Sequence, residues 1–308
     1  MISSSFRSAA VLAVAVVLFL SGLGTGCAAP DSADQPQRTP LMIGAIPDQD
    51  PEILQRLNGA LADYLETELG VPVVYKPVTD YVAAVTAFKV GGLDLVWFGG
   101  LTGVQARLQV PGAKAIVQRD IDERFHSVFI ANAGSGLLPF EGVEGLGRLE
   151  GHTFTFGSES STSGRLMPQY FIQRAGLDLQ DFKGEVGFSG SHDATIKLVE
   201  SGSYDAGALN EQVWLSRVES GEVDPARVLV LWRTPAYYDY HWVMRPDVQE
   251  RYGAEFPEKI QSAFTSLDPS VPEQKEILDL FGAKKFIPTK NSNYAAIEKI
   301  GREIGKIK

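Results

Sequence analysis

The sequence predicts an α/β fold of two lobes, each a mostly parallel sheet flanked by helices, with a ligand cleft between the lobes. Short apolar runs alternate with amphipathic helical patterns along residues 41–305. This alternation is typical of parallel strands joined by helices. About 270 residues follow the N-terminal segment, which is enough for two ordinary domains. Clefts between such domains are preferred sites for small molecules.

The first predicted helix follows the apolar run at 41–47 and carries clear end signals. Asp50 is a suitable N-cap, Pro51 occupies the first helical position and Gly70 ends the helix. One apolar stripe is expected to face the core, formed by Ile53, Leu54, Leu57, Leu61, Tyr64 and Leu65.

The remaining elements are assigned by the same criteria. Further strands are expected at 71–78, 93–99, 114–119, 125–132, 152–157, 185–190, 204–209, 227–232 and 241–246. Further helices are expected at 80–91, 143–151, 164–176, 192–202, 210–221, 247–266, 270–281 and 291–305. The second lobe is expected at 131–234, inserted in a first lobe of 41–130 plus 235–308.

The N-terminus is typical of an export signal. Residues 1–26 contain Arg7, an apolar stretch and then small residues. The small residues before Cys27 resemble a bacterial lipobox, although Leu23 lies four places before the cysteine rather than three. Residues 27–40 are then a lipidated Cys27 and a flexible tether. The alternative is an ordinary secretory signal with a chance cysteine.

Composition excludes several classes of protein. The formal charge is −10, and becomes −11 when Arg7 is removed with the signal. Nucleic acid is therefore not an expected partner. Cys27 is the single cysteine, and His126, His152 and His241 lack the spacing of metal ligands. We expect no metal and no cofactor.

Four hydroxyl residues in "SESSTSGRLMP" (158–168) lie between a predicted strand and a predicted helix. A linker is a poor interpretation inside a lobe, and the G-x-S-x-G spacing of a nucleophile elbow is absent. An anion site fits better, because free helix amides and hydroxyls all donate and Gly164 permits close approach. A plain Ser/Thr helix cap is the alternative. Arg165 follows, and the sequence leaves open whether it faces solvent or ligand.

This segment, with "DYVAAVTAFKVGGLDLVWFGG" before it and "GSHDATIKLVESGSYDAGALN" after it, resembles the PhnD-like binding subunits of ABC importers for phosphate, phosphite and phosphonate. The similarity covers most of 41–305. It implies a type II periplasmic-binding-protein-like fold and an oxyanion held by Ser161, Thr162, Ser163 and Gly164. The runs "WFGGLTGVQAR" and "TPAYYDYHW" look closest to a branch of selenate or related oxyanion binders.

Further candidates lie at the expected edge of the cleft. On the resemblance, Tyr81 closes over the ligand and His192 contacts the oxyanion. His192 could also tune affinity with pH, or it could be incidental to a cap formed by Ser191 and Asp193. The other cleft candidates, each with a core or surface alternative, are Trp97, Phe98, Tyr238 and Asp239.

Asn210 departs from the acidic residue that many phosphonate binders carry near this point. A neutral amide can donate to a fully ionised oxyanion, whereas a carboxylate would repel it. This favours a compact tetrahedral anion over an aminoalkyl phosphonate. Asp239 and Glu211 keep recognition of an amine open.

We therefore expect a monomeric, lipid-anchored solute-binding protein outside the cytoplasm that delivers an oxyanion to an ABC permease and its ATPase. The expected ligands are phosphonate, phosphite, phosphate or selenate. One rival is a phosphoester hydrolase using Ser161 or His192, which would need an oriented general base or a metal. Another is an extracytoplasmic sensor lobe that docks on a membrane kinase.

Overall fold

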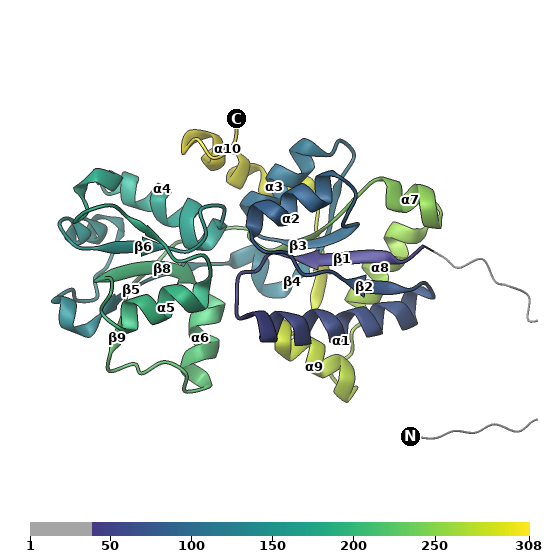
Figure 1. Cartoon of the computed structure of the whole chain (residues 1–308), viewed down its shortest axis with the longest axis horizontal. Helices are drawn as coiled ribbons and strands as arrows, with labels where there is room; N and C mark the ends of the chain where they lie inside the picture. Colours follow the sequence, from purple (N-terminus) through teal and green to yellow (C-terminus); the bar gives the residue numbers. More distant parts are fainter. Residues whose placement is uncertain (1–38) are drawn as a thin grey trace, which may run out of the picture. The chain divides into compact units, whose positions relative to one another are not determined.

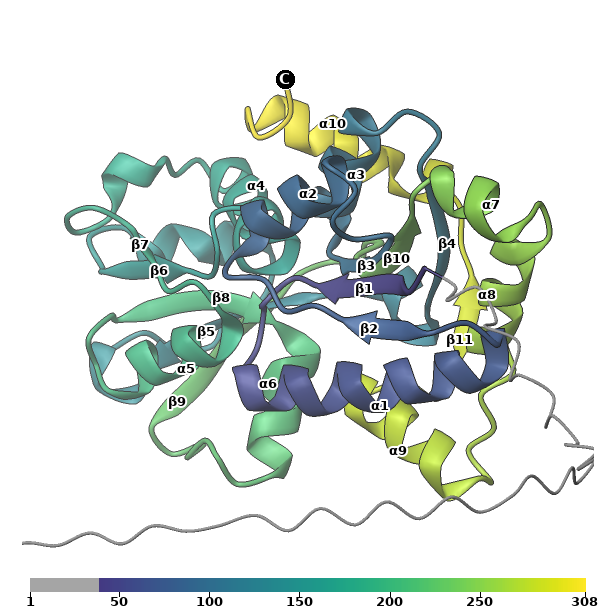
Figure 2. The ribbon, with the colours of Figure 1, turned by 45° about the vertical axis from the view of Figure 1, so that its right-hand side comes forward.

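The computed structural model describes residues 39–308 (Figure 1). The expected signal at 1–26, the lipidated Cys27 and nearly all of the tether at 27–40 lie outside the described residues. The described chain forms one sheet of six strands and one of five. Helices cover both faces of each sheet (Figure 2). The predicted α/β architecture is confirmed.

The first sheet has the strand order β11-β4-β10-β3-β1-β2. Strand β1 is parallel to β2 and β3, whereas β10 is antiparallel to both β3 and β4. Helices α2 and α3 lie on one face, and α1 and α9 on the other (Figure 1). The elements of this part are β1 (Leu41–Ala45), α1 (Pro51–Leu69), β2 (Val73–Tyr75), α2 (Tyr81–Lys89), β3 (Leu95–Phe98), α3 (Gly100–Gln109), β4 (Lys114–Arg119), β10 (His241–Met244), α7 (Asp247–Tyr252), α8 (Phe256–Thr265), α9 (Pro272–Phe281), β11 (Phe286–Pro288) and α10 (Ala295–Glu303).

The second sheet has the strand order β7-β6-β8-β5-β9. Strand β6 is parallel to β7 and β8, whereas β5 is antiparallel to β8 and β9. Its elements are β5 (Ser127–Asn132), β6 (Phe154–Phe156), α4 (Met167–Arg174), β7 (Gly187–Phe188), α5 (His192–Glu200), β8 (Ala206–Asn210), α6 (Glu211–Glu219) and β9 (Val228–Arg233).

Each sheet is mixed, and most of its strands run in one direction, as expected. Strands β10 and β11 run against the other strands of the first sheet, and β5 runs against those of the second. Strands β5 and β10 enter a lobe directly from the other lobe, so no crossover helix requires them to be parallel. Because β5 pairs entirely within the second sheet, we place the first crossing before Ser127 rather than at 130.

Local end signals predicted the first two helices correctly. The Asp50 side chain accepts a hydrogen bond from Glu52 N, Pro51 is the first helical residue and Gly70 has φ 67°. Asp80 caps α2 in the same way, by accepting from Ala83 N at 2.7 Å. These caps place the first residue of α2, Tyr81, at the end of the helix that faces the second lobe.

Other elements differ from prediction. Helix α3 and strand β11 are not among the elements assigned above from the sequence. The helix expected at 247–266 is divided into α7 and α8 at Gly253, which has φ 107°. The helix expected from Gly164 begins earlier, with a π-helical turn at Thr162–Leu166 that continues into α4.

Candidate functional site

The hydroxyl turn, residues 161–164, occupies the start of the helix that continues into α4. The Ser161 hydroxyl accepts a hydrogen bond from Gly164 N at 2.9 Å, so Ser161 is the helix cap. Thr162 and Ser163 fall within the π-helical turn and are at most 2% exposed. Such turns occur often at functional sites. The hydroxyls of Thr162 and Ser163 therefore lie at the start of a helix and are buried by the surrounding protein.

Gly164 lets this turn lie directly against strand β6. The Gly157 amide donates to Gly164 O at 2.9 Å. A Cβ on Gly164 would lie 3.2 Å from Gly157 Cα, closer than nearly all such contacts. A residue with a side chain would thus force the turn away from the strand. On the other side, the Ser127 hydroxyl of β5 donates to Ser163 O at 2.7 Å.

The first lobe meets the hydroxyl turn through the N-terminus of α3. Leu101 N donates to Thr162 Oγ1 at 2.9 Å, and Gly100 N donates to Asp239 Oδ1 at 2.8 Å. Asp239 comes from the segment that returns the chain to the first lobe. These two amides lie in the first turn of α3 and have no acceptor within the helix. They bind a hydroxyl of the second lobe and a carboxyl of the return segment instead.

Tyr81 also enters this region from the first lobe. It is 2% exposed, and its Oη makes no hydrogen bond of normal geometry to the described residues, although the Ser161 hydroxyl lies close to it. Burial raises its pKa well above the ordinary value of a tyrosine, so the hydroxyl keeps its proton. A buried hydroxyl without a partner is costly, and it is available to a ligand.

A second group of polar side chains converges on the Tyr240 hydroxyl. It lies 3.2 Å from His192 Nε2, accepts from Asn210 Nδ2 at 3.1 Å and donates to Asp48 Oδ2 at 2.7 Å. Burial lowers the pKa of His192 to about 4, which leaves the ring neutral near pH 7. A change in the charge of His192 would therefore tune anion affinity near pH 4 and not in the neutral range.

Two carboxyl groups are fully buried in the same region. Burial raises the pKa of Asp48 to about 6 and that of Asp239 to about 7. Asp239 Oδ2 and Ser163 Oγ make no hydrogen bond of normal geometry to the described residues, although Thr162 and Tyr237 respectively lie close to them. These groups and Tyr81 come from three elements and both lobes. The oxygens of a bound anion could accept from the two hydroxyls and from the protonated form of Asp239.

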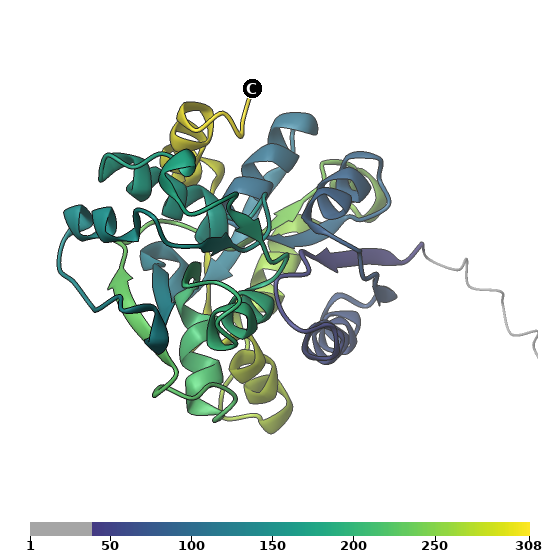
Figure 3. The same cartoon turned by 60° about the vertical axis from the view of Figure 1, so that its left-hand side comes forward.

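Several predicted residues do not join this cluster. Phe98 packs edge-on against Phe88 in the core, and Glu211 is ion-paired with Arg233. Tyr238 lines a groove of about 920 Å³ to which both α4 and α10 contribute residues. The two helices lie near each other in Figure 3. The Trp97 ring stacks on the Tyr240 ring with their centroids 5.5 Å apart. Trp97 therefore packs against the tyrosine whose hydroxyl belongs to the polar cluster.

Arg165 is buried rather than exposed to solvent. It is 4% exposed, and its guanidinium lies over the rings of Phe156 in β6 and Phe188 in β7. Burial lowers its pKa to about 10. Its Nε and Nη1 have no hydrogen-bond partner among the described residues.

Sequence analysis missed Asp48, Tyr240 and Ser127. Asp48 follows β1 at the carboxyl end of a parallel strand, an edge where ligands bind in open α/β sheets. That position could have identified it. Tyr240 and Ser127 lie on or beside the strands that cross between lobes, and no local pattern distinguishes them from core residues.

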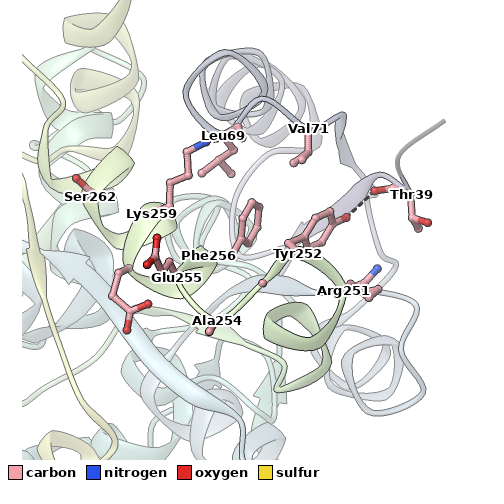
Figure 4. Close-up of a pocket in the computed structure, with 12 residues that line it drawn as sticks. Thr39, Leu69, Val71, Arg251, Tyr252, Ala254, Glu255, Phe256, Lys259 and Ser262 are labelled. Carbon is pink, nitrogen blue, oxygen red and sulfur yellow. Dashed lines mark hydrogen bonds between the residues drawn. The ribbon is translucent and has the colours of Figure 1, made fainter. Parts of the chain in front are cut away.

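A separate hollow of about 1180 Å³ lies on the first lobe beside α7 and α8 (Figure 4). Tyr252 Oη donates to Thr39 O at 2.6 Å, and Lys259 Nζ donates to Leu69 O at 2.7 Å. The polar ends of Tyr252 and Lys259 thus have partners within the protein. Residues of the polar cluster are not among those that line it.

No helix within residues 39–308 has the length and apolar character needed to cross a membrane. No group of three or more His, Cys, Asp or Glu side chains in this part of the chain is arranged to hold a metal.

Residues 43–294 match the model of a protein family described as the periplasmic substrate-binding protein of a phosphonate ABC transporter. The chain belongs to this family. Its members are binding proteins of transporters, which act with permease and ATPase subunits. The solved structures similar to this chain include two-lobed type II periplasmic binding proteins.

Relatives support the family assignment. The chain is 48% identical over 269 residues to a probable phosphite-binding protein, PhnD1, of Prochlorococcus marinus, covering 87% of this chain and 91% of the relative. The solved PhnD1 structure in complex with methylphosphonate has a TM-score of 0.85 and covers 87% of this chain and 99% of PhnD1. A phosphonate-transporter binding protein from Pseudomonas aeruginosa is 20% identical with a TM-score of 0.72, covering 85% of each chain, and shows the fold alone.

Proposed function

We propose that this chain captures a small tetrahedral phosphorus oxyanion between its lobes and delivers it to an ABC permease. The observation that carries the proposal is the set of buried, unpartnered atoms: Tyr81 Oη, Ser163 Oγ and Asp239 Oδ2. The 48% identical relative is named as a phosphite-binding protein and was solved with methylphosphonate. Phosphite and methylphosphonate are therefore the first candidate ligands, ahead of phosphate and selenate.

We assign the hydroxyl turn, residues 161–164, as the anion grip. Thr162 and Ser163 would donate hydroxyl protons, and the helix start adds amide donors and the positive end of its dipole. Tyr81, His192 and Asn210 would complete the shell as neutral groups, with Asp239 as the acidic member. Donors that are neutral, buried and fixed can hold an anion without a salt bridge.

We propose that the chain performs no chemistry. His192 Nε2 lies near the Tyr240 hydroxyl rather than a serine hydroxyl. The Ser161 hydroxyl accepts the cap hydrogen bond from Gly164 N. A serine nucleophile requires a base within hydrogen-bond reach, held in turn by a third group. We further propose that the protein is a monomer, anchored outside the cytoplasm through a lipidated Cys27.

A panel of anions tests the function. The exported chain carrying Cys27→Ser, freed of ligand by unfolding and refolding, is offered phosphite, methylphosphonate, 2-aminoethylphosphonate, phosphate, sulfate, selenate and molybdate in separate thermal-shift assays. A ligand at a thousand times its dissociation constant stabilises the folded state by about 4 kcal/mol. We expect the largest shifts with phosphite and methylphosphonate. Melting temperatures that stay constant across the panel would exclude the proposal.

The raised pKa of Asp239 predicts a pH dependence of binding. Its pKa of about 7 means that the acid can donate to an anion oxygen below pH 7, whereas the carboxylate formed above pH 7 repels the anion. We expect methylphosphonate affinity to fall between pH 6 and pH 8, more steeply in wild type than in Asp239→Asn. Ionisation of the ligand is common to both proteins and cancels in the ratio of dissociation constants. Parallel profiles from isothermal titration would contradict this role.

Asp239 also affects the stability of the ligand-free protein. Its pKa is about 7 in the folded protein, against an ordinary value of 3.8 for an aspartate, so the folded state binds more protons between these pH values. The contribution of this group to stability is therefore greatest at low pH and is lost as the pH rises toward 7. Asp239→Asn should remove that slope.

A further inference from the structure

Next to Asp48 of the polar cluster, the loop between β1 and α1 makes hydrogen bonds from one lobe to the other. Asp50 N donates to Asp193 Oδ2 at 2.8 Å, and Arg217 Nη2 donates to Gln49 Oε1 at 3.2 Å. Gln49 and Asp50 belong to the first lobe, whereas Asp193 lies in α5 and Arg217 in α6 of the second. We call these four residues the clasp.

The second-lobe half of the clasp is assembled before the lobes meet. Arg217 Nε donates to Asp193 Oδ1 at 2.7 Å, and both side chains are at most 12% exposed. This ion pair lies within one lobe, so lobe opening leaves it intact. The carboxylate is thereby held in one orientation, and little rotamer freedom is lost when Asp50 N arrives.

The first-lobe half presents the positive end of a helix. Asp50 is the N-cap of α1, so its amide lies where the helix dipole favours a negative charge. The hydrogen bond from Asp50 N to Asp193 is thus charge-assisted, and such bonds are stronger than neutral ones. His192 N also donates to Asp48 O at 2.9 Å, which adds a contact between the same two segments.

We propose that Asp193, oriented by Arg217, is a positioning residue that stabilises the closed lobes and thereby sets ligand affinity without contacting ligand. The inference rests on the proposed function. A ligand that contacts both lobes binds the closed form, so its apparent affinity depends on how much of the protein can close. Asp193 follows His192 in sequence, but its carboxylate is engaged by Arg217 and Asp50.

Asp193→Asn tests the clasp because it removes the charge and keeps the shape. Losing a hydrogen bond to a charged group predicts roughly ten- to hundredfold weaker binding of methylphosphonate or phosphite. We expect this loss in the dissociation rate with the association rate nearly constant, because closure follows encounter. A merely structural role would instead lower the melting temperature of the ligand-free protein and leave the affinity of the folded fraction unchanged.

Glu159→Gln is the matched control, since Glu159 also pairs across the lobes, with Lys306 at 3.6 Å, but is 66% exposed. Exposed pairs contribute little, so its affinity should equal that of wild type. Asp50→Pro and Asp50→Ala form a second pair in case Asp193→Asn folds poorly. Both lose the side-chain cap, but only proline also loses the N–H, and φ −56° at this position suits proline. Weaker binding by the proline variant than by the alanine variant supports the clasp.

The outcomes separate this inference from the proposed function. If wild type binds methylphosphonate or phosphite and Asp193→Asn binds equally well, the clasp is rejected and the function stands. If wild type binds no anion of the panel, small-angle scattering of the ligand-free proteins decides the clasp. A more open Asp193→Asn then supports it, and identical profiles overturn it.

Discussion

Replacing Thr162 and Ser163 together with alanine is expected to weaken methylphosphonate and phosphite binding at least a hundredfold. Each hydrogen bond to a charged group contributes about 1.5–3 kcal/mol, and the two are lost together. Thr162→Ala also leaves Leu101 N without its acceptor from the other lobe. Isothermal titration with each ligand measures the effect.

Ser160→Ala is the control for this experiment, because Ser160 belongs to the same segment but is only half-buried. Its affinity should remain within about twofold of wild type, since surface substitutions change free energies by at most about 0.5 kcal/mol. Full affinity in the double variant would remove the hydroxyl turn from the ligand site and return it to the role of a helix cap.

Gly103→Ala is expected to lower the free energy of unfolding by about 1–3 kcal/mol, the usual cost of overpacking a core. A Cβ at Gly103 in α3 would overlap the ring of His241. That ring is fully buried, stacks on Tyr294 at 3.7 Å and lies 3.0 Å from Asp239 O through Nδ1. It has no free space to enter, so its displacement should also shift Asp239 and weaken ligand binding. Denaturant unfolding and isothermal titration measure the two effects.

Gly59→Ala gives the matched comparison. Gly59 is also a helical glycine, in α1, but a Cβ there would meet nothing within 4 Å. Alanine should therefore stabilise this helix by about 0.5–1 kcal/mol. If Gly103→Ala proved as stable as Gly59→Ala, the packing of His241 against α3 would not be the constraint described here.

The sequence predicted best those features that depend on neighbouring residues. Helix α1 has its cap at Asp50, its proline at position 51 and its terminal glycine at position 70, as expected. A cap is formed by atoms two to four residues apart, so its chemistry is visible in a short stretch of sequence. Strand directions are not local, so local patterns did not identify β5, β10 and β11 as the antiparallel strands.

The polar cluster was partly predictable for the same reason. The hydroxyl turn has a composition unlike an ordinary cap, and Tyr81 and His192 lie at helix starts that their own caps announce. Tyr240 and Asp48 carry no such signal, because each is defined by what another segment brings against it. Phe98 was assigned to the cleft although its side chain points to the face of β3 that packs on Phe88.

By itself, the sequence determined the α/β class, the capped helices and the segment of hydroxyl residues at a helix start. Each of these depends on short-range chemistry: hydrophobic period, cap geometry and free amides. The tertiary structure alone decided that the Arg165 guanidinium lies over the Phe156 ring and that Asp193 meets Asp50 across the lobes. It also decided that burial raises the pKa of Asp48 to about 6 and that of Asp239 to about 7. Burial and long-range contact are properties of the folded chain, because segments as far apart as residues 50 and 193 become neighbours only when both lobes have formed.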